Sequence, residues 1–313
     1  MLSIPKVYVG EVKNYDPLKL REAVTSLLEY TQCRHIFRSG DSVLIKPNFV
    51  MAPKQKEHPV VTNPFLLMEL IKCMKDLGTR PFLADSPGWG NPASIARKIG
   101  LSDFCSKNQV PIKKIRHLRF QKNPFPFGPK WMPVSKDVLE ADHVINVPKL
   151  KSHTQMYLTL SVKNLFGCVP GRLKAFFHNW YGKNPHRFTD LILANALMIK
   201  PCLHIVDGIS AMHKAGPMLG EPLPLGLLFA GTDPITVDQI ICHMIQADLQ
   251  QVKILQSAKK NNLMPFSVSD IETSVPLNSL SPLPIFHHVE FLAPVQFNLY
   301  RVIRGLIKNW FTK

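Results

Sequence analysis

The sequence is poor in acidic residues and lacks the cysteine patterns typical of metal and iron–sulfur proteins. It contains 22 Asp and Glu against 38 Lys and Arg, which gives a formal net charge of +16. The six cysteines are scattered and no CxxC occurs, so we expect neither a zinc site nor an iron–sulfur cluster within this chain. No apolar run approaches the roughly 18 residues that a membrane-spanning helix needs. Helix-turn-helix, zinc-finger and RNP-type patterns are also missing.

The composition instead indicates a folded basic protein with an anionic partner. Hydrophobic residues make up 45% of the chain, which is enough for a core. The first ten residues, MLSIPKVYVG, contain no apolar signal region, so we expect a reducing cytoplasmic setting and free cysteines. The charge predicts nucleic acid, a carboxylated or phosphorylated small molecule, or an anionic membrane surface as partner.

Short apolar segments with the composition of buried strands alternate with helical patterns. We predict strands at Val43–Lys46, Pro81–Ala84, His143–Val147, Leu203–Val206 and Leu227–Ala230, and helices at Pro64–Leu77, from Pro92 onward and at Pro234–Ala247. This alternation predicts an α/β domain over residues 1–260, with a mainly parallel sheet and helices on both faces. Residues 261–313 are predicted to form an irregular, Pro- and Ser-rich extension that ends in a basic amphipathic helix over 297–313. Such a helix docks on its own domain, on a partner, or in a membrane interface, which would make the protein peripheral to the membrane.

The segment between Asp142 and Asp190 contains no acidic residue but holds seven Lys or Arg and four His. It begins with a predicted buried strand and then presents Lys149, Lys151 and His153 close together. Cations at the end of an apolar strand are costly unless an anion meets them. The segment is therefore our first candidate for a binding site.

Polar residues follow each predicted strand. They are Lys46 and Asn48; Asp85 and Ser86; Lys149, Lys151, Ser152 and His153; Asp207; and Asp233 with Asp238. Ligands of open α/β sheets bind beyond the carboxyl ends of the strands, so we expect these groups at one edge. Lys163 and Asn164, which follow a further apolar segment, join the set.

Several of these positions also have a purely structural interpretation. Asp233 followed by Pro234 resembles a helix N-cap, and Asp207 followed by Gly208 suits a turn as well as a site. His153 is better placed for chemistry, because neighbouring lysines favour its neutral form, which can act as a base or metal ligand. A second acid-free window, Phe104–Lys136, has eight Lys or Arg among aromatic residues. Either its aromatic rings stack on nucleic-acid bases, or the window is a segment that runs over the protein surface without a binding role.

An ordered set of motifs resembles the DUF362 family. The motifs are IKPN (Ile45–Asn48), ADSPG (Ala84–Gly88), INVPKLKSH (Ile145–His153), LTLSVKNLFGCVPG (Leu158–Gly171), IVDGI (Ile205–Ile209), AGPMLGEP (Ala215–Pro222) and GTDPITVD (Gly231–Asp238). The resemblance implies an α/β protein, often linked to ferredoxin-type iron–sulfur modules, although this chain lacks their Cys-rich motif. It also implies a site at the positions already chosen from the strand ends. A fainter similarity to the lactate racemase family carries over no residues and no nickel cofactor.

These observations predict an enzyme that acts on a small anionic substrate at the carboxyl edge of the sheet. The predicted catalytic residues are His153, Lys151, Lys163 and Asp85, and the predicted substrate-binding residues are Lys46, Asn48, Ser86, Lys149, Asn164 and Asp207. Asp85 and Asp207 would alternatively hold a divalent metal that bridges to the substrate. Carboxylates among the lysines favour a small molecule over nucleic acid. The alternatives are a non-enzymatic scaffold for nucleic acid or an acidic partner, and an accessory that exchanges electrons with an iron–sulfur redox partner.

Overall fold

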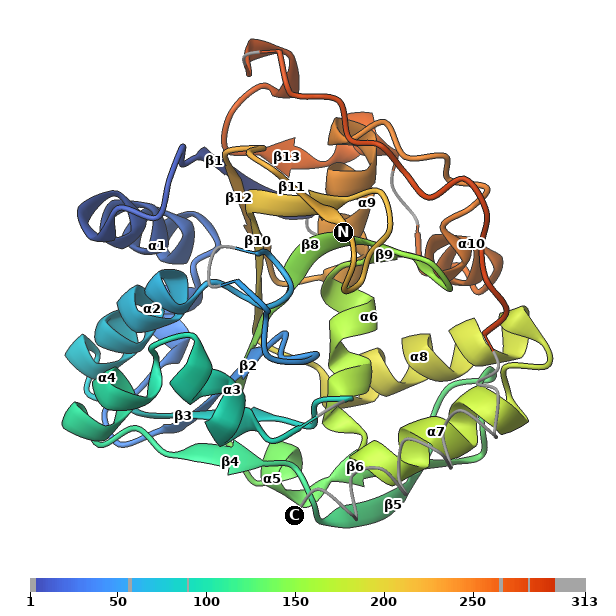
Figure 1. Ribbon diagram of the computed structural model, residues 1–313, viewed down its shortest axis with the longest axis horizontal. Coiled ribbons are helices and arrows are strands. Elements are labelled where there is room, and N and C mark those ends of the chain that lie inside the picture. The colour runs from blue at the N-terminus through green and yellow to red at the C-terminus, as the bar shows by residue number, and fades with distance from the viewer. Residues whose placement is uncertain (1–3, 56–57, 89, 265–266, 281, 296–313) are drawn as a thin grey trace.

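A large mixed sheet forms the centre of the protein, and helices lie on both of its faces (Figure 1). The computed structural model describes residues 4–55, 58–88, 90–264, 267–280 and 282–295. The main path of strands in the described part is β13-β1-β12-β10-β7-β2-β3-β4, with β8 and β11 paired to β10 and β9 paired to β8. The pairs from β4 through β3, β2 and β7 to β10 are all parallel. The predicted α/β class, with a mostly parallel sheet between helices, is confirmed.

The strands of this sheet are β1 (Lys6–Glu11), β2 (Ser42–Pro47), β3 (Arg80–Asp85), β4 (Ile112–Lys114), β7 (His143–Val147), β8 (Lys149–His153), β9 (Tyr157–Thr159), β10 (Leu203–His213), β11 (Glu221–Leu223), β12 (Leu227–Gly231) and β13 (Glu272–Thr273). A separate two-stranded sheet pairs β5 (Leu118–Lys122) with β6 (Trp131–Ser135). The α-helices are α1 (Pro17–Tyr30), α2 (Pro64–Asp76), α3 (Pro92–Lys98), α4 (Ser102–Lys107), α5 (Lys136–Leu139), α6 (Ser161–Leu165), α7 (Gly171–Trp180), α8 (Pro185–Ile199), α9 (Pro234–Met244) and α10 (Lys253–Lys260). Four short 3-10 helices are η1 (Cys33–Ile36), η2 (Phe166–Cys168), η3 (Val268–Asp270) and η4 (Leu277–Ser279).

Five helices begin with Asn or Asp followed by Pro. The pairs are Asp16–Pro17, Asn63–Pro64, Asn91–Pro92, Asn184–Pro185 and Asp233–Pro234. In each, the side chain of the first residue accepts an N–H bond from the first turn, and the proline stands where no N–H partner is needed. The N-cap interpretation of Asp233 is thereby confirmed, since its carboxylate accepts from Thr236 N at 2.7 Å.

Side chains that alternate along the strands feed two separate cores. On β2, Val43 and Ile45 pack among the residues of α1 and α2, whereas Leu44 packs on the opposite side with those of α8 and α9. Because both faces of the sheet are covered by helices, its interior strands read as continuous apolar runs. Buried polar side chains lie mainly at the strand ends and in the segments that leave them, although Asn146, His204 and Asp207 lie within strands.

Two expectations about strand ends are wrong. β12 runs antiparallel to β10, so that Gly231 lies beside His204 and the end of β12 is at the opposite edge from the others. Asp207 neither ends a strand nor forms a turn. β10 continues beyond it to His213, and this longer strand pairs with β8 and β11. Apolar runs in the sequence indicate where strands lie. They indicate neither the direction of a strand nor the pairing of β8 with β10.

The described part of the C-terminal extension packs against the domain. β13 pairs with β1, and Ile271, Phe286 and Val295 are buried in the core. The predicted helix over 297–313 lies outside the described residues. Within the described part of the chain, no helix has the length and apolar character needed to cross a membrane.

Candidate functional site

The ten predicted site residues lie around the carboxyl ends of β2 and β3, on β8 and on the neighbouring β10 and α6. Nine of them are buried and Lys163 is half-buried. A further lysine, Lys174 of α7, reaches the same place. We call Lys46, Lys149, Lys151, Lys163 and Lys174 the lysine cluster. Its members come from β2, β8, α6 and α7, so the fold gathers them from distant parts of the sequence.

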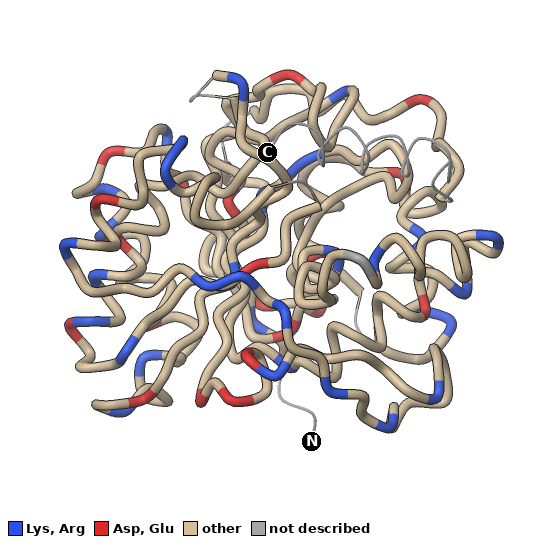
Figure 2. Tube along the Cα trace, turned by 60° about the horizontal axis from the view of Figure 1, so that its bottom comes forward, with Lys and Arg blue, Asp and Glu red and all other residues tan. Residues whose placement is uncertain are grey.

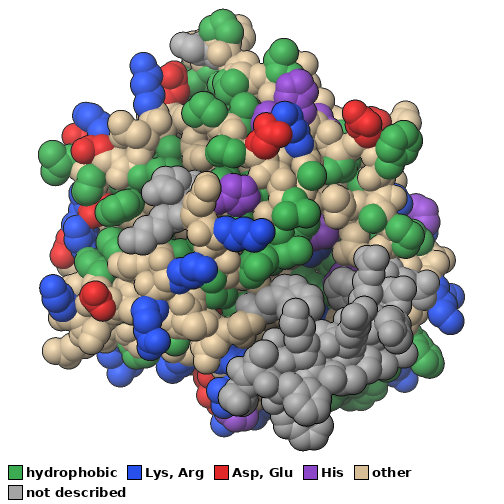
Figure 3. Space-filling model, viewed as in Figure 1, with side chains coloured by type: hydrophobic (Ala, Val, Ile, Leu, Met, Phe, Trp, Pro, Cys, Tyr) green, Lys and Arg blue, Asp and Glu red, His purple; other side chains and the backbone are tan. Residues whose placement is uncertain are grey.

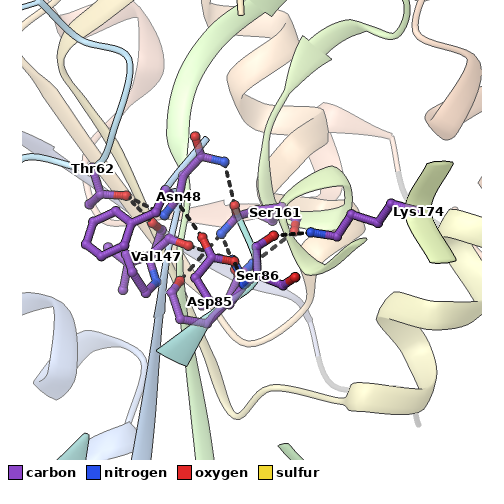
Figure 4. A network of polar contacts seen from close by, with 12 residues as sticks. Asn48, Thr62, Asp85, Ser86, Val147, Ser161 and Lys174 are labelled. Carbon is purple, nitrogen blue, oxygen red and sulfur yellow. Dashed lines mark hydrogen bonds and ion pairs between the residues drawn. The ribbon is translucent and has the colours of Figure 1, made fainter. Parts of the chain in front are cut away.

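Lys46 and Asp85 form a buried ion pair at the ends of β2 and β3, and Figure 4 shows Asp85 within its network of polar contacts. Lys46 Nζ lies 2.8 Å from Asp85 Oδ1, and the side chains are 1% and 4% exposed. Asp85 also accepts the backbone N–H groups of Ser86 at 2.7 Å and Phe49 at 2.8 Å. Both carboxylate oxygens therefore have donors, which fix the orientation of the Asp85 side chain.

Lys149 and Asp207 form a second buried pair. Their Nζ and Oδ2 atoms are 2.8 Å apart, and the Tyr15 hydroxyl accepts from Lys149 at 2.7 Å and donates to Asp207 Oδ1 at 2.7 Å. Burial lowers the pKa of Lys149, and Asp207 opposes that effect. Burial and the charge of Asp207 raise the pKa of Tyr15 well above its usual range, so the phenol keeps its proton. This triad links β8, β10 and the segment before α1.

Three asparagines join β2, β7 and α6. Asn48 Nδ2 donates to Asn164 Oδ1 at 2.6 Å, and Asn164 Nδ2 donates to Asn146 Oδ1 at 2.8 Å. Among the described residues, Asn48 Oδ1 and the Ser86 hydroxyl are buried without a hydrogen-bond partner. Buried polar atoms are usually paired, so these two groups offer hydrogen-bonding capacity to a ligand.

The other three lysines of the cluster have no carboxylate among the described residues. Lys151 Nζ donates to Val60 O at 2.7 Å, and Lys174 Nζ donates to Ser86 O. No described ion pair includes Lys151, Lys163 or Lys174. The five lysines of the cluster therefore have two carboxylate partners among the described residues, Asp85 and Asp207.

Burial and mutual repulsion weaken the charged form of these three side chains. The pKa of Lys151 is well below its usual range, because of burial first and then the charges of Lys163 and Lys149. Burial, with Lys46 nearby, lowers the pKa of Lys163 to about 8. Burial also lowers that of Lys174 to about 8, despite the opposing charge of Asp85. Proton loss from these amines is the alternative to an anionic partner.

The proton position on His153 is fixed by its backbone neighbours. Its Nδ1 atom accepts from the N–H groups of Gln155 at 3.1 Å and Met156 at 3.3 Å. Burial and the charges of Lys163 and Lys151 hold its pKa well below its usual range. The neutral ring thus carries its proton on Nε2, which makes that atom a hydrogen-bond donor rather than a base.

His178 of α7 has the opposite arrangement. Its Nδ1 atom lies 3.1 Å from Val295 O, and because a carbonyl can only accept, Nδ1 carries the proton. Burial first, and then the charge of Lys163, lower the pKa of His178 to about 3. Both histidines beside Lys163 are therefore neutral at physiological pH.

Asp238 supports the helix that carries Lys163 and Asn164. Although the sequence suggested that Asp238 joins the site directly, its carboxylate accepts the N–H groups of Ser161 at 2.7 Å and Val162 at 3.1 Å. Burial raises its pKa to about 7, and these backbone donors oppose the shift. Asp238 therefore serves as an acceptor for the first turn of α6, where unpaired N–H groups would be costly.

Gly167 allows η2 to approach the ion pair of Lys46 and Asp85. A Cβ atom at this position would lie 2.7 Å from Lys46 Nζ and 2.8 Å from Asp85 Oδ1. Both of those side chains are buried and held by other contacts. The contact explains why glycine is needed here.

Sequence reasoning missed Tyr15, Asn146, Lys174 and His178. Lys174 and His178 lie in the acid-free segment and share one face of α7 at a spacing of four residues, a signal that was available. No such signal marks Tyr15, because 134 residues separate it from its hydrogen-bond partner Lys149. Asn146 lies inside a buried strand, where its role depends on the partner from α6.

The chain is similar to a protein family and to a curated protein. A family model described as Domain of unknown function (DUF362) matches residues 43–243. A curated relative, "Thylakoid-associated protein sll1697" from Synechocystis sp., is 32% identical over 304 residues, which cover 96% of this chain and 93% of the relative. The predicted family is thereby confirmed.

Two solved structures resemble the chain. The lactate racemase apoprotein from Thermoanaerobacterium thermosaccharolyticum aligns with a TM-score of 0.50 at 12% identity, and this chain spans 58% of that chain's length while 79% of this chain is covered. A Thermotoga maritima protein aligns with a TM-score of 0.44 at 13% identity, over 65% of this chain and 52% of that one. At this identity, the first alignment shows a shared fold alone.

We predict that Gly167→Ala disturbs the Lys46–Asp85 pair. The added methyl group overlaps both charged atoms, so the free energy of unfolding should fall by about 1–3 kcal/mol. Urea denaturation measures the change. The matched control is Gly88→Ala, which adds the same group close to the site in open space. Equal effects of the two substitutions would contradict the proposed overlap.

We also predict that Asp238→Ala and Asp238→Asn differ. Alanine leaves two buried N–H groups without an acceptor, which should cost about 1–3 kcal/mol of unfolding free energy, whereas asparagine keeps one oxygen acceptor. Because the folded pKa is about 7 against 3.8 ordinarily, this carboxyl reduces stability as pH rises between those values. Asp238→Asn should remove that part of the pH dependence. Denaturation across this pH range tests both points, and equal losses in the two variants would show that the acceptor role is wrong.

Proposed function

The chain belongs to the DUF362 family, and from its site we propose that it binds a small anion, a carboxylate or a phosphate, at the lysine cluster and acts on it as an enzyme. The observation that carries this proposal is the excess of cations. Lys151 is buried, Lys163 and Lys174 are half-buried, and none of the three forms an ion pair among the described residues. An anion there would restore their charged forms and replace the water lost on burial.

The burial of the cluster supports a small ligand over a polymer. Lys46, Lys149 and Lys151 are at most 1% exposed, so a nucleic-acid backbone or an acidic protein surface cannot reach them. On the surface, Lys and Arg side chains stand mostly apart from one another over the face shown in Figure 3, with Asp and Glu mainly toward its margins. On this face, the described side chains do not form the continuous basic groove that a nucleic-acid strand uses.

We assign proton transfer to Lys163 and charge stabilisation to His153. Lys163 and Lys174 are both half-buried with a pKa of about 8, which suits proton transfer near neutral pH, but Lys174 Nζ already donates to Ser86 O, so Lys163 is the better candidate. The Nε2–H group of His153 would donate to an oxygen that gains negative charge during the reaction. Lys151 would bind the ligand's anionic group.

Asp85 and Asp207 fit orienting roles better than proton transfer. Each holds one lysine at 2.8 Å and also accepts backbone N–H groups. A divalent metal at either carboxylate would have to displace its lysine. Within the described residues, no group of three or more His, Cys, Asp or Glu side chains is arranged to hold a metal ion.

We predict that Lys163→Ala and Lys151→Ala weaken anion binding. Loss of one charge-assisted hydrogen bond should reduce affinity by about tenfold or more. Isothermal titration with phosphate, oxalate, acetate and citrate measures this, with Lys214→Ala as control because Lys214 is exposed and pairs with Glu221. If none of these anions binds, or the three variants bind alike, the proposed site is wrong.

We also predict that Lys163→Met stabilises the ligand-free protein. With a folded pKa of about 8 against 10.5 ordinarily, Lys163 is charged in both folded and unfolded chains below pH 8, where its burial is fully destabilising. The substitution should raise the unfolding free energy by roughly 1–3 kcal/mol below pH 8, and the gain should vanish as pH rises to 10.5. Urea denaturation at both ends of this range tests it. Exposed Lys183→Met should change little, and a loss of stability in Lys163→Met would refute the idea of an unpaired buried cation.

A second proposal concerns location: we infer peripheral contact with a membrane. The relative that is 32% identical over nearly the whole chain is named a thylakoid-associated protein. The net charge of +16 suits an anionic lipid surface. The predicted amphipathic helix over 297–313 lies outside the described residues. Cosedimentation of the full chain with anionic vesicles tests this proposal.

A further inference from the structure

The β5–β6 ribbon and the end of β4 carry exposed cations and exposed aromatic rings together. We call these residues the ribbon surface: Lys113, Lys114, Arg116, Arg119, Phe120, Lys122, Lys130 and Trp131, all of them exposed. β4, β5 and β6 lie along the bottom of Figure 1, and Figure 2 brings that side forward, where Lys and Arg positions run across the front of the tube. The ribbon surface contains none of the lysine cluster.

The two aromatic side chains are unusually exposed for their size. Phe120 is 58% exposed and Trp131 is 54% exposed. Phe120 pairs with Pro133 and Lys122 with Trp131, so the two rings are diagonal neighbours on one face of the ribbon. On the other face, Met132 and Val134 are fully buried in the core. Lys122 therefore shares the face of the two rings, whereas Arg119, which pairs with Val134, lies on the face of Met132 and Val134.

The connection between β5 and β6 is fixed to the domain. Asn123 Nδ2 donates to Phe127 O at 2.7 Å and to Pro129 O at 3.0 Å, which closes the turn. Gly128, at φ +77°, lies against α8, where an added Cβ atom would be 2.9 Å from Ala194 Cβ. Because these contacts hold the β5–β6 connection against α8, the orientation of the ribbon and of its two rings is fixed relative to the core.

The charge around the rings is of one sign. The chain has no acidic residue between Asp103 and Asp137. Within the described residues, none of the six cations of the ribbon surface forms an ion pair. These cations are therefore available to an anionic surface.

We propose that the ribbon surface is where the protein meets an anionic lipid bilayer, with Phe120 and Trp131 entering the headgroup region and the surrounding cations meeting lipid phosphates. This inference rests on the proposed membrane contact and gives it a location. Aromatic rings with adjoining Lys and Arg are the combination that binds such interfaces, by apolar burial and by electrostatic attraction. Rings that project from a ribbon suit a broad, soft surface better than a strand of nucleic acid, which needs cations that follow its phosphates along a groove.

The test is cosedimentation of the full chain with vesicles of phosphatidylcholine and phosphatidylglycerol, and with vesicles of phosphatidylcholine alone. The wild-type chain should bind the mixed vesicles more tightly, and added salt should weaken that binding. The double variant Phe120→Ala, Trp131→Ala should lose about tenfold or more in affinity through lost apolar burial. The double variant Lys122→Glu, Lys130→Glu should also lose about tenfold or more, because each lysine contributes to attraction near the surface.

Matched controls come from other faces of the domain. Phe65→Ala removes a ring that is 48% exposed on α2, and Lys259→Glu, Lys260→Glu on α10 makes the same change in net charge. Both controls should bind mixed vesicles nearly as well as the wild type. Thermal unfolding of every variant checks that the fold is kept.

The outcomes separate the two proposals. If the wild type binds mixed vesicles but the ribbon variants bind equally well, the ribbon inference is wrong and the membrane contact stands. If the wild type binds no vesicles, both are wrong. If it binds both vesicle types equally, the role of the cations is wrong. If a single-stranded oligonucleotide binds more tightly than vesicles and only the oligonucleotide is lost in the ribbon variants, the surface binds nucleic acid instead.

Discussion

Charge compensation inside the domain is the constraint on which this structure depends. A buried ammonium group is tolerated when a carboxylate and further hydrogen bonds meet it, and Lys46 and Lys149 satisfy that condition at 2.8 Å each. The chain then places three more lysines near these pairs and provides no described carboxylate for them. A fold that served stability alone would exchange such groups for apolar ones, because unpaired buried charge lowers stability. These unpaired lysines are the basis of the proposal that a ligand supplies the missing negative charge.

The surrounding structure is arranged to keep these charges in place. Asp85 is bound by two backbone N–H groups, and Asp207 is bound by Tyr15 and a backbone N–H, so neither carboxylate is free to turn toward a competing cation. Gly167 lets the chain after α6 close over the first pair, and Asp238 supports the first turn of α6. These contacts come from β2, β3, β10, α6 and α9. A small displacement of any of these elements would therefore shift the positions of the lysines. Preorganisation of this kind is what electrostatic catalysis requires.

Much of this arrangement was predictable, and the failures have physical causes. Buried strands carry most of their polar groups at their ends, so Lys46, Asp85 and Lys149 could be selected from the sequence, whereas Asn146 inside β7 could not. The direction of a strand leaves no such signal, because an apolar run looks the same in a parallel and in an antiparallel strand. The end of β12 is therefore expected at the wrong edge of the sheet. Asp207 was expected at a strand end, yet β10 continues because β8 and β11 pair with it. Tyr15 and Asn146 act only through partners far away in the sequence, and hydrophobic periodicity carries no information on such partners.

The two proposed anion-binding regions, the lysine cluster and the ribbon surface, would respond differently to added salt because only the lysine cluster is buried. At physiological ionic strength the screening length is about 8 Å, so the exposed cations of the ribbon surface lose much of their attraction when salt is added. Lys151 lies inside the domain, where water and counterions cannot surround it, and its interaction with an anion would be screened much less. Salt would then release the protein from a lipid surface while leaving its internal site able to bind ligand. The same physical difference suits a buried, partly neutral cluster to one small anion, and an exposed, fully charged surface to a large one.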